Sequence, residues 1–277
     1  MEQNIYKPIQ CEVIDVFEES PTIKTIRLKP LEPFSFLAGQ FISFTVPGIG
    51  EAPFTPSSSP FEKNYMEVTV MKTGKVTAAI HQIKKADIVG IRGPYGKPYP
   101  MEKFADKNIL LVGGGVGLAP LRALFYALIE TLDNYKSIVF CLGARSPVDF
   151  IFKKEVFETW LSESWLSSYK KISFRITADK KDETWKYNEG VVTKILDNLP
   201  FVPENAVVCG PPVMMKFTTL KLLDVGYKPE EIYLSMERKM YCAIGQCRHC
   251  LLGDKFVCKD GPVFTYEEIK NQPKIWA

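Results

Sequence analysis

The sequence of 277 residues lacks the features that mark several common classes of protein. Its formal net charge is only +3 and no basic run stands out, so nucleic acid is not expected as a partner. The longest apolar stretch, residues 109–121, is interrupted by glycines and is shorter than the roughly 18 residues that a membrane span needs. Residues 1–13 contain no apolar core of a signal peptide. We therefore expect a cytoplasmic protein without a membrane span.

The seven cysteines do not form the pattern of a secreted disulfide framework. Such a framework distributes its cysteines through a small domain. Here Cys11, Cys141 and Cys209 stand alone in apolar surroundings, and the other four lie within seventeen residues near the C-terminus. This distribution indicates a reducing compartment and one clustered metal site.

The first hundred residues are typical of a β domain. Short strand-like runs occur at residues 11–16, 22–28, 40–46, 65–71 and 87–93. Pro, Gly and Ser separate these runs, and a single helix is predicted over residues 76–83. Many short strands with such breaks predict an antiparallel barrel.

From residue 107 the pattern changes to alternating strands and helices. Apolar runs at residues 108–112, 137–142, 172–177, 206–209 and 232–235 predict strands. Helical spacing occurs at residues 120–130, 152–160 and 212–225. This alternation predicts a doubly wound parallel sheet with helices on both faces. We expect three parts, at residues 1–102, 103–236 and 237–277.

Two turns of the predicted α/β domain could bind a dinucleotide. Gly113, Gly114, Gly115 and Gly117 follow the first strand, where the absence of side chains lets backbone N–H groups approach a pyrophosphate. The run is not a strict G-x-G-x-x-G, and alone it could be an ordinary turn. A later strand ends in Cys209-Gly210-Pro211. Because ligands bind at the carboxyl ends of parallel strands, we expect the two turns to be neighbours.

The clustered cysteines favour an iron–sulfur centre. Cys242, Cys247 and Cys250 have the C-x4-C-x2-C spacing of a plant-type 2Fe–2S loop, and Cys258 supplies a fourth thiolate. Zinc is the alternative, but zinc sites usually pair C-x2-C units of similar size. Gly245 gives the loop freedom to turn N–H groups toward sulfur.

The motifs GGGVGLAP, LGARSP and CGPPVMM, preceded by a barrel, resemble the ferredoxin–NADP reductase superfamily. The resemblance spans residues 8 to 265. It implies that Cys209 lies beside the nicotinamide carbon that exchanges hydride, and that Gly210 and Pro211 shape its pocket. It also implies that Gly113–Gly117 hold the pyrophosphate and that Gly143, Ala144 and Arg145 lie near the adenosine ribose of NADH or NADPH.

The same resemblance implies an FAD site in the barrel. The superfamily's R-x-Y-[ST] motif corresponds to Ala52-Pro53-Phe54-Thr55, in which Phe54 packs against the flavin and the Thr55 hydroxyl reaches flavin N5. Ala52 replaces the arginine that would clamp the pyrophosphate. The implied FAD contacts are Pro53, Phe54, Thr55, Val70, Met71, Lys72, Gly74, Val76 and Thr77. Catalytic roles fall to Thr55 and Cys209.

The C-terminal segment resembles the B subunit of anaerobic sulfite reductase and the gamma subunit of cytosolic nickel–iron (sulf)hydrogenases. The electron-transfer subunit of dihydroorotate dehydrogenase is a more distant relative. We expect NAD(P)H to deliver electrons through FAD and a 2Fe–2S cluster to a multi-cluster subunit of an anaerobic sulfite reductase, which acts with a siroheme subunit. The alternatives are a hydrogenase complex with a nickel–iron catalytic subunit, and a non-catalytic zinc-binding scaffold subunit.

Overall fold

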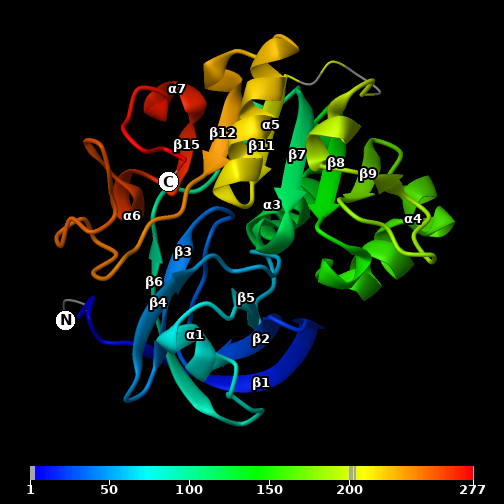
Figure 1. The fold of residues 1–277 in the computed structure, drawn as a ribbon. Helices are drawn as coiled ribbons and strands as arrows, with labels where there is room; N and C mark the ends of the chain where they lie inside the picture. Colours follow the sequence, from blue (N-terminus) through cyan, green and yellow to red (C-terminus); the bar gives the residue numbers. More distant parts are fainter. Residues whose placement is uncertain (1–3, 200–201, 203, 277) are drawn as a thin grey trace. The chain divides into compact units, whose positions relative to one another are not determined.

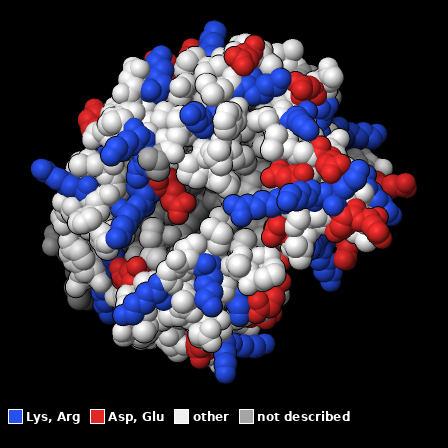
Figure 2. Space-filling view, in the orientation of Figure 1, with Lys and Arg blue, Asp and Glu red and all other residues white. Residues whose placement is uncertain are grey.

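The computed structural model describes residues 4–199, 202 and 204–276, and the chain divides into two compact units. The first unit comprises Met1–Tyr99, Arg122–Ala127 and Met236–Val263, and the second comprises Pro100–Leu121, Leu128–Ser235 and Phe264–Ala277. The cysteine segment therefore belongs to the same unit as the N-terminal β domain. Basic and acidic side chains are interspersed on the face shown in Figure 2, as the small net charge suggests.

The first unit is built on a six-stranded antiparallel sheet with the order β4-β3-β6-β1-β2-β5 (Figure 1). Its strands are β1 (Ile9–Ser20), β2 (Ile23–Pro30), β3 (Phe41–Val46), β4 (Gly50–Phe54), β5 (Met66–Met71) and β6 (Ile88–Tyr95). The edge strand β5 also pairs with the segment that follows β4, through a bridge between Val68 and Pro56. Helix α1 (Lys75–Ile80) follows β5. The fold predicted for this part is confirmed, but β4 was not predicted.

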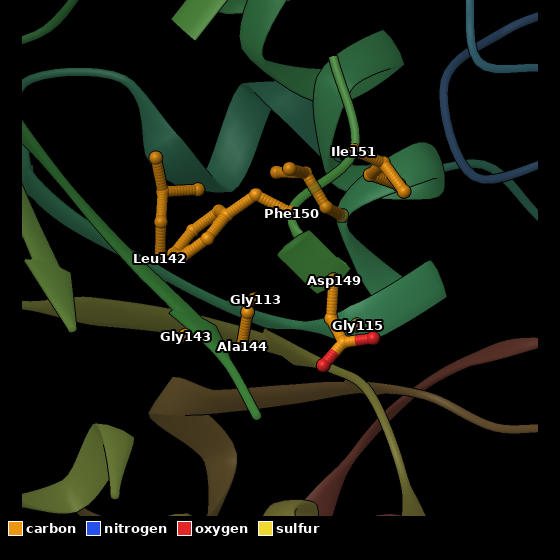
Figure 3. Close-up of a pocket in the computed structure, with 9 residues that line it drawn as sticks. Gly113, Gly115, Leu142, Gly143, Ala144, Asp149, Phe150 and Ile151 are labelled. Atoms are coloured by element: carbon orange, nitrogen blue, oxygen red, sulfur yellow. The ribbon is translucent and has the colours of Figure 1, made fainter. Parts of the chain in front are cut away.

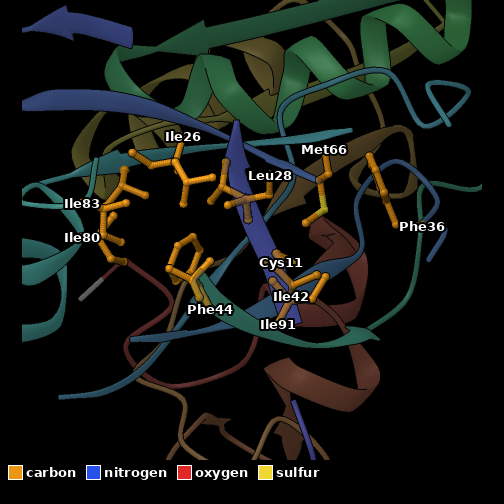
Figure 4. Close-up of a cluster of buried hydrophobic side chains, with 14 of the residues drawn as sticks. Cys11, Ile26, Leu28, Phe36, Ile42, Phe44, Met66, Ile80, Ile83 and Ile91 are labelled. Atoms are coloured by element: carbon orange, nitrogen blue, oxygen red, sulfur yellow. The ribbon is translucent and has the colours of Figure 1, made fainter. Parts of the chain in front are cut away.

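Apolar side chains from several of these strands form one core. Ile26, Leu28, Ile42 and Phe44 are fully buried and gather inside the sheet (Figure 4). Cys11 belongs to the same core, and burial raises the pKa of its thiol to about 12. Cys11 is therefore a small apolar core residue, as its surroundings in the sequence suggested.

The second unit is an α/β fold with a seven-stranded sheet of order β10-β9-β8-β7-β11-β12-β15. Its strands are β7 (Asn108–Gly114), β8 (Ser137–Ala144), β9 (Ile172–Ala178), β10 (Asn188–Glu189), β11 (Asn205–Cys209), β12 (Ile232–Ser235) and β15 (Val263–Thr265). Strands β7 to β12 pair in parallel, with Cys209 opposite Gly113. The predicted fold class is confirmed.

Helices connect the strands of this sheet at the places the sequence predicts. Helix α3 (Leu118–Glu130) follows β7, the π-helix η4 (Lys154–Trp160) lies between β8 and β9, and α5 (Pro212–Asp224) follows β11. Cys141 of β8 is fully buried, and burial raises the pKa of its thiol to about 12. No helix in the described part of the chain is long and apolar enough to cross a membrane.

The cysteine segment contains little regular structure. It includes the short hairpin of β13 (Leu251–Leu252) and β14 (Lys255–Phe256), followed by α6 (Val257–Asp260). Backbone contacts join the end of this segment to the end of β6. The N–H of Lys97 donates to the Gly261 carbonyl at 2.6 Å, and Lys97 bridges to Pro262.

Gly96 allows this close approach. Its φ is +76°, and a Cβ atom there would lie 2.7 Å from the Gly261 carbonyl oxygen and 2.6 Å from Cδ of Pro262. Gly48, in the turn between β3 and β4, has a similar φ of +73° but open space around the position of a Cβ atom. The two glycines therefore share backbone strain and differ in crowding.

We expect Gly96→Ala to destabilise the protein by about 2–4 kcal/mol, because it adds a clash to the conformational cost of about 1–2 kcal/mol. Gly48→Ala should cost only the conformational part. Thermal unfolding of both variants, with iron analysis, measures the difference. Equal unfolding midpoints and equal iron contents would contradict the proposed role of the Gly96 contact.

Candidate functional site

The glycine turn and the Cys209 turn meet at the carboxyl edge of the second unit's sheet. A Cβ atom on Gly117 would lie 2.5 Å from the Cys209 carbonyl carbon and oxygen and 2.5 Å from Cα of Gly210. Gly115 has φ +55° and open space beside it. The prediction that the two turns are neighbours is confirmed. Helix α3, which has thirteen residues, begins beside them.

A pocket lies against this turn and the end of β8 (Figure 3). Its lining includes Gly113, Gly115, Gly143, Ala144 and Asp149. The exposed Arg145, expected near the ribose, does not line it. Sequence reasoning missed Asp149, whose carboxylate accepts a 2.6 Å hydrogen bond from the Ser146 hydroxyl. The S-x-x-D spacing was the available signal, since it is typical of a helix start.

Cys209 ends β11 and is largely buried, with 7% of its surface exposed. Pro211, two residues later, is exposed. Gly210 lies close to the glycine turn, because a Cβ atom on it would lie 3.1 Å from the Gly114 carbonyl oxygen. Met214 packs on the same two turns, since a Cβ atom on Gly114 or Gly210 would lie 2.3 Å or 2.8 Å from its Sδ.

The flavin motif lies on the edge strand β4. Phe54 pairs with Ile42, and its ring packs edge-to-face on Phe44 at 6.3 Å. Ala52 lies opposite Phe44, so its side chain shares the face of Phe54. Thr55 follows directly. Helix α1 is adjacent to this strand, because a Cβ atom on Gly50 would lie 3.5 Å from Val76. The two segments expected to bind FAD are therefore neighbours within the first unit.

The loop before α1 is ordered by the Thr77 side chain. The Thr77 hydroxyl accepts hydrogen bonds from the N–H groups of Thr73 and Gly74, both at 2.8 Å. Val70, at the end of β5, is buried, and its carbonyl lies 2.9 Å from Nε2 of His81. Met71 and Lys72 are exposed. Thr77 thus fixes the turn before α1, where the sequence predicts a contact with the FAD diphosphate.

On the opposite face of β4, Glu51 forms a dense polar network. Its carboxylate accepts hydrogen bonds from Ser43 and Thr45 and from Arg92, whose Nη2 lies 2.5 Å away. Burial opposes the ionisation of Glu51, but the hydrogen bonds of Arg92, Thr45 and Ser43 outweigh it and hold the pKa of this carboxyl below its usual range. Arg92 is therefore engaged by Glu51 and does not replace the arginine missing at Ala52.

The four cysteines of the C-terminal segment form two pairs. Sγ of Cys250 lies 3.2 Å from Sγ of Cys258, and Sγ of Cys242 accepts a hydrogen bond from the N–H of Cys247 at 3.3 Å. In the described residues, no three His, Cys, Asp or Glu side chains converge on one metal ion. Two neighbouring thiol pairs fit a two-iron cluster, which takes two thiolates on each iron.

Backbone N–H groups point at these sulfurs. The N–H of Gly245, at φ +77°, donates to Sγ of Cys258 at 3.1 Å, and the N–H groups of Gln246 and Cys247 donate to Sγ of Cys242 at 3.3 Å. Backbone N–H groups of His249 and Cys242 lower the pKa of Cys247 to about 7. Burial, followed by the Cys250 side chain, raises that of Cys258 to about 12. Hydrogen bonds to the sulfurs are one of the factors that set the potential of an iron–sulfur cluster.

Three family models match the chain. They describe an oxidoreductase FAD-binding domain at residues 10–99, an oxidoreductase NAD-binding domain at residues 111–219, and the iron–sulfur cluster binding domain of dihydroorotate dehydrogenase B at residues 237–270. These matches and the two folds define an oxidoreductase that binds FAD, a nicotinamide nucleotide and an iron–sulfur cluster.

Relatives match over nearly the whole chain. Sulfhydrogenase 2 subunit gamma of Pyrococcus furiosus is 35% identical over 95% of this chain and 96% of its own. Sulfhydrogenase 1 subunit gamma of the same organism is 34% identical over 98% and 95%. A probable electron transfer subunit of dihydroorotate dehydrogenase B (NAD(+)) from Methanocaldococcus jannaschii is 33% identical over 95% and 92%.

Solved structures share the fold. The structure of an NADH-dependent reduced ferredoxin–NADP oxidoreductase, described in connection with flavin-based electron bifurcation, is 25% identical and has a TM-score of 0.73 over 97% of this chain and 91% of that chain. A ferredoxin NADP+ reductase from Neisseria gonorrhoeae, at 18% identity and TM-score 0.68, covers 81% of this chain and 96% of its own. The chain belongs to the ferredoxin–NADP reductase-like family of electron-transfer subunits with FAD-binding, NAD-binding and iron–sulfur domains.

We expect Gly117→Ala to weaken NADH binding by about tenfold or more, because a Cβ atom must displace the Cys209 turn, and a cost of about 1.4 kcal/mol gives that factor. Titration of the purified protein with NADH measures the dissociation constant. Gly226→Ala is the control, since Gly226 has φ +101° and open space beside it, outside the two turns. Unchanged affinity in Gly117→Ala would argue against a nicotinamide site at this contact.

Proposed function

We propose that the chain oxidises NADH or NADPH and passes the electrons, through FAD and a 2Fe–2S cluster, to a partner subunit. The observation that carries the proposal is the pairing of the four thiols in the same unit as the flavin motif. A bound flavin accepts two electrons as hydride and can release them one at a time to a cluster. The chain would thus convert two-electron into one-electron transfer.

Each part of the chain has a limited task in this proposal. Gly113–Gly117 hold the pyrophosphate with backbone N–H groups, and Gly210 and Pro211 leave space beside Cys209 for the nicotinamide ring. Phe54 packs against the flavin, and the Thr55 hydroxyl donates to its N5. Cys242, Cys247, Cys250 and Cys258 bind the cluster. Hydride transfer needs no general acid or base, so His249 has no catalytic role in this proposal. Its Nδ1 lies 3.0 Å from the Cys247 carbonyl oxygen.

The partner we propose first is the catalytic assembly of a sulfhydrogenase-type complex with a nickel–iron subunit. The gamma subunits of Pyrococcus furiosus sulfhydrogenases, at 35% and 34% identity, support it. An anaerobic sulfite reductase, with a multi-cluster subunit and a siroheme subunit, is the second candidate. It is supported by the seven-residue gap before Cys258 and by the GKVT segment at residues 74–77.

Replacement of one cluster ligand should remove the cluster and leave the reduction of the flavin by NADH intact. We expect Cys258→Ser to lose most of its iron and labile sulfide, from about two of each per chain, while NADH still bleaches the flavin absorbance. Cys141→Ala, which alters a buried cysteine outside the segment, should retain its iron. Metal analysis and anaerobic titration provide the measurements. Full iron content in Cys258→Ser, or one zinc per wild-type chain, would contradict the assignment of a 2Fe–2S cluster to these cysteines.

Purification of the intact complex distinguishes the partners. We expect subunits that carry nickel and evolve hydrogen with NADPH or NADH as donor. A siroheme absorbance and NADH-dependent sulfite reduction would instead establish the second candidate. A wild-type chain that binds no flavin, or whose flavin is not bleached by either nucleotide, would overturn the electron-transfer proposal for both.

A further inference from the structure

Three charged side chains form an ionic triad inside the first unit. Glu67 of β5 is 3% exposed. One carboxylate oxygen accepts from Arg27 of β2, with Nε at 2.9 Å and Nη2 at 2.7 Å. The other accepts from Nη1 of Arg122 at 2.6 Å. Arg27 is sandwiched between the rings of Phe17 and Tyr65.

The two arginines differ in what else they contact. Nη1 of Arg122 also donates to the Ser57 carbonyl at 3.0 Å, so one nitrogen links Glu67 to the segment after Thr55. The Arg27 side chain is 31% exposed, whereas that of Arg122 is 10% exposed. Arg27 already balances the charge of Glu67. Burial of a second guanidinium costs solvation free energy, and the charge of one carboxylate does not require a second arginine. Arg122 also lies over the Tyr126 ring at 5.2 Å, and what it adds to the flavin motif is the contact with Ser57.

The segment that Arg122 contacts is held from several directions. We define the flavin loop as residues 55–58, which begins at Thr55. The N–H of Ser57 donates to the Glu67 carbonyl at 2.8 Å, and the Ser57 hydroxyl lies 2.9 Å from that of Thr69. The Ser58 hydroxyl accepts from the N–H of Glu67 at 3.0 Å. Ser57 and Ser58 are buried, so this backbone is fixed by protein contacts.

Arg122 contacts the flavin loop from a different element than the contacts described above. The other contacts come from β5, the neighbour of the loop in the sheet, whereas Arg122 lies on helix α3, five residues after Gly117. The buried Arg122 side chain thus connects the flavin loop with the part of helix α3 that belongs to the first unit.

We propose that Arg122 is a positioning residue: it fixes the Ser57 carbonyl and thereby the backbone that presents Thr55 to the flavin. The inference rests on the proposed flavin site. In this proposal Arg122 acts on the flavin site through Ser57. Arg27, which binds the same carboxylate without contacting the loop, serves as its matched control.

The first test measures the loop itself, in the full-length protein without FAD. Hydrogen exchange of a peptide covering residues 55–58 should be about tenfold faster in Arg122→Met than in Arg27→Met, because only the first variant releases the Ser57 carbonyl. Arg122→Lys should restore most of the protection, since one ammonium can donate to both acceptors, as Nη1 does. Equal exchange in Arg122→Met and Arg27→Met would overturn the proposal.

The second test measures the consequence for the flavin. Arg122→Met should bind FAD about tenfold more weakly than Arg27→Met and should shift the flavin absorption band. The nicotinamide dissociation constant should stay within about twofold. If Arg122→Met does not fold, Arg122→Gln replaces it with the same expected direction. FAD affinity equal to that of Arg27→Met would overturn the proposal. A wild-type chain that binds no FAD would instead refute the proposed function, while the exchange experiment would still decide the role of Arg122 in the loop.

Discussion

The backbone contact between the end of β6 and residues 261–262 is the constraint that holds the cysteine segment on the β domain of the first unit. It places the cysteine segment in the same compact unit as the strand that carries the flavin motif. The contact needs glycine at position 96, where both the positive φ and the crowding exclude a side chain. A second link joins the ends of the unit, since the Tyr6 hydroxyl donates to the Gln246 side chain at 3.0 Å. The N–H of Gln246 donates in turn to Sγ of Cys242.

Features that depend on local spacing could be predicted from the sequence. The strands β7, β8 and β11 appear as uninterrupted apolar runs because both of their faces are buried, and the glycine turn follows the first run directly. The cysteine loop is local as well, so the spacing of its first three members indicated the cluster. Edge strand β4 was missed because Pro53 interrupts it, and a proline is tolerated only at a sheet edge.

Features that depend on distant pairing could not be predicted. Strand β15 has only three residues and joins the sheet of the second unit from the far end of the chain. The triad of Arg27, Glu67 and Arg122 joins residues 40 and 55 positions apart, and nothing local distinguishes these charges from solvated ones. The same holds for Arg92 and Glu51. The sequence predicts residues for contact with the cofactors, but it gives no sign of these buried ion pairs between distant positions.

The surroundings of the sulfur atoms, rather than burial, divide the cysteines into chemically distinct sets. The thiols of Cys11 and Cys141 have pKa values near 12, so at neutral pH they remain neutral and bind metal poorly. Burial also raises the pKa of Cys258 to about 12, but its Sγ lies 3.2 Å from that of Cys250 and accepts from the N–H of Gly245. Cys11 and Cys141 lie in two different cores, so they cannot present paired thiolates to the iron of a cluster. By burying these two cysteines apart from each other, the packing of two separate cores helps to restrict the cluster to the C-terminal segment.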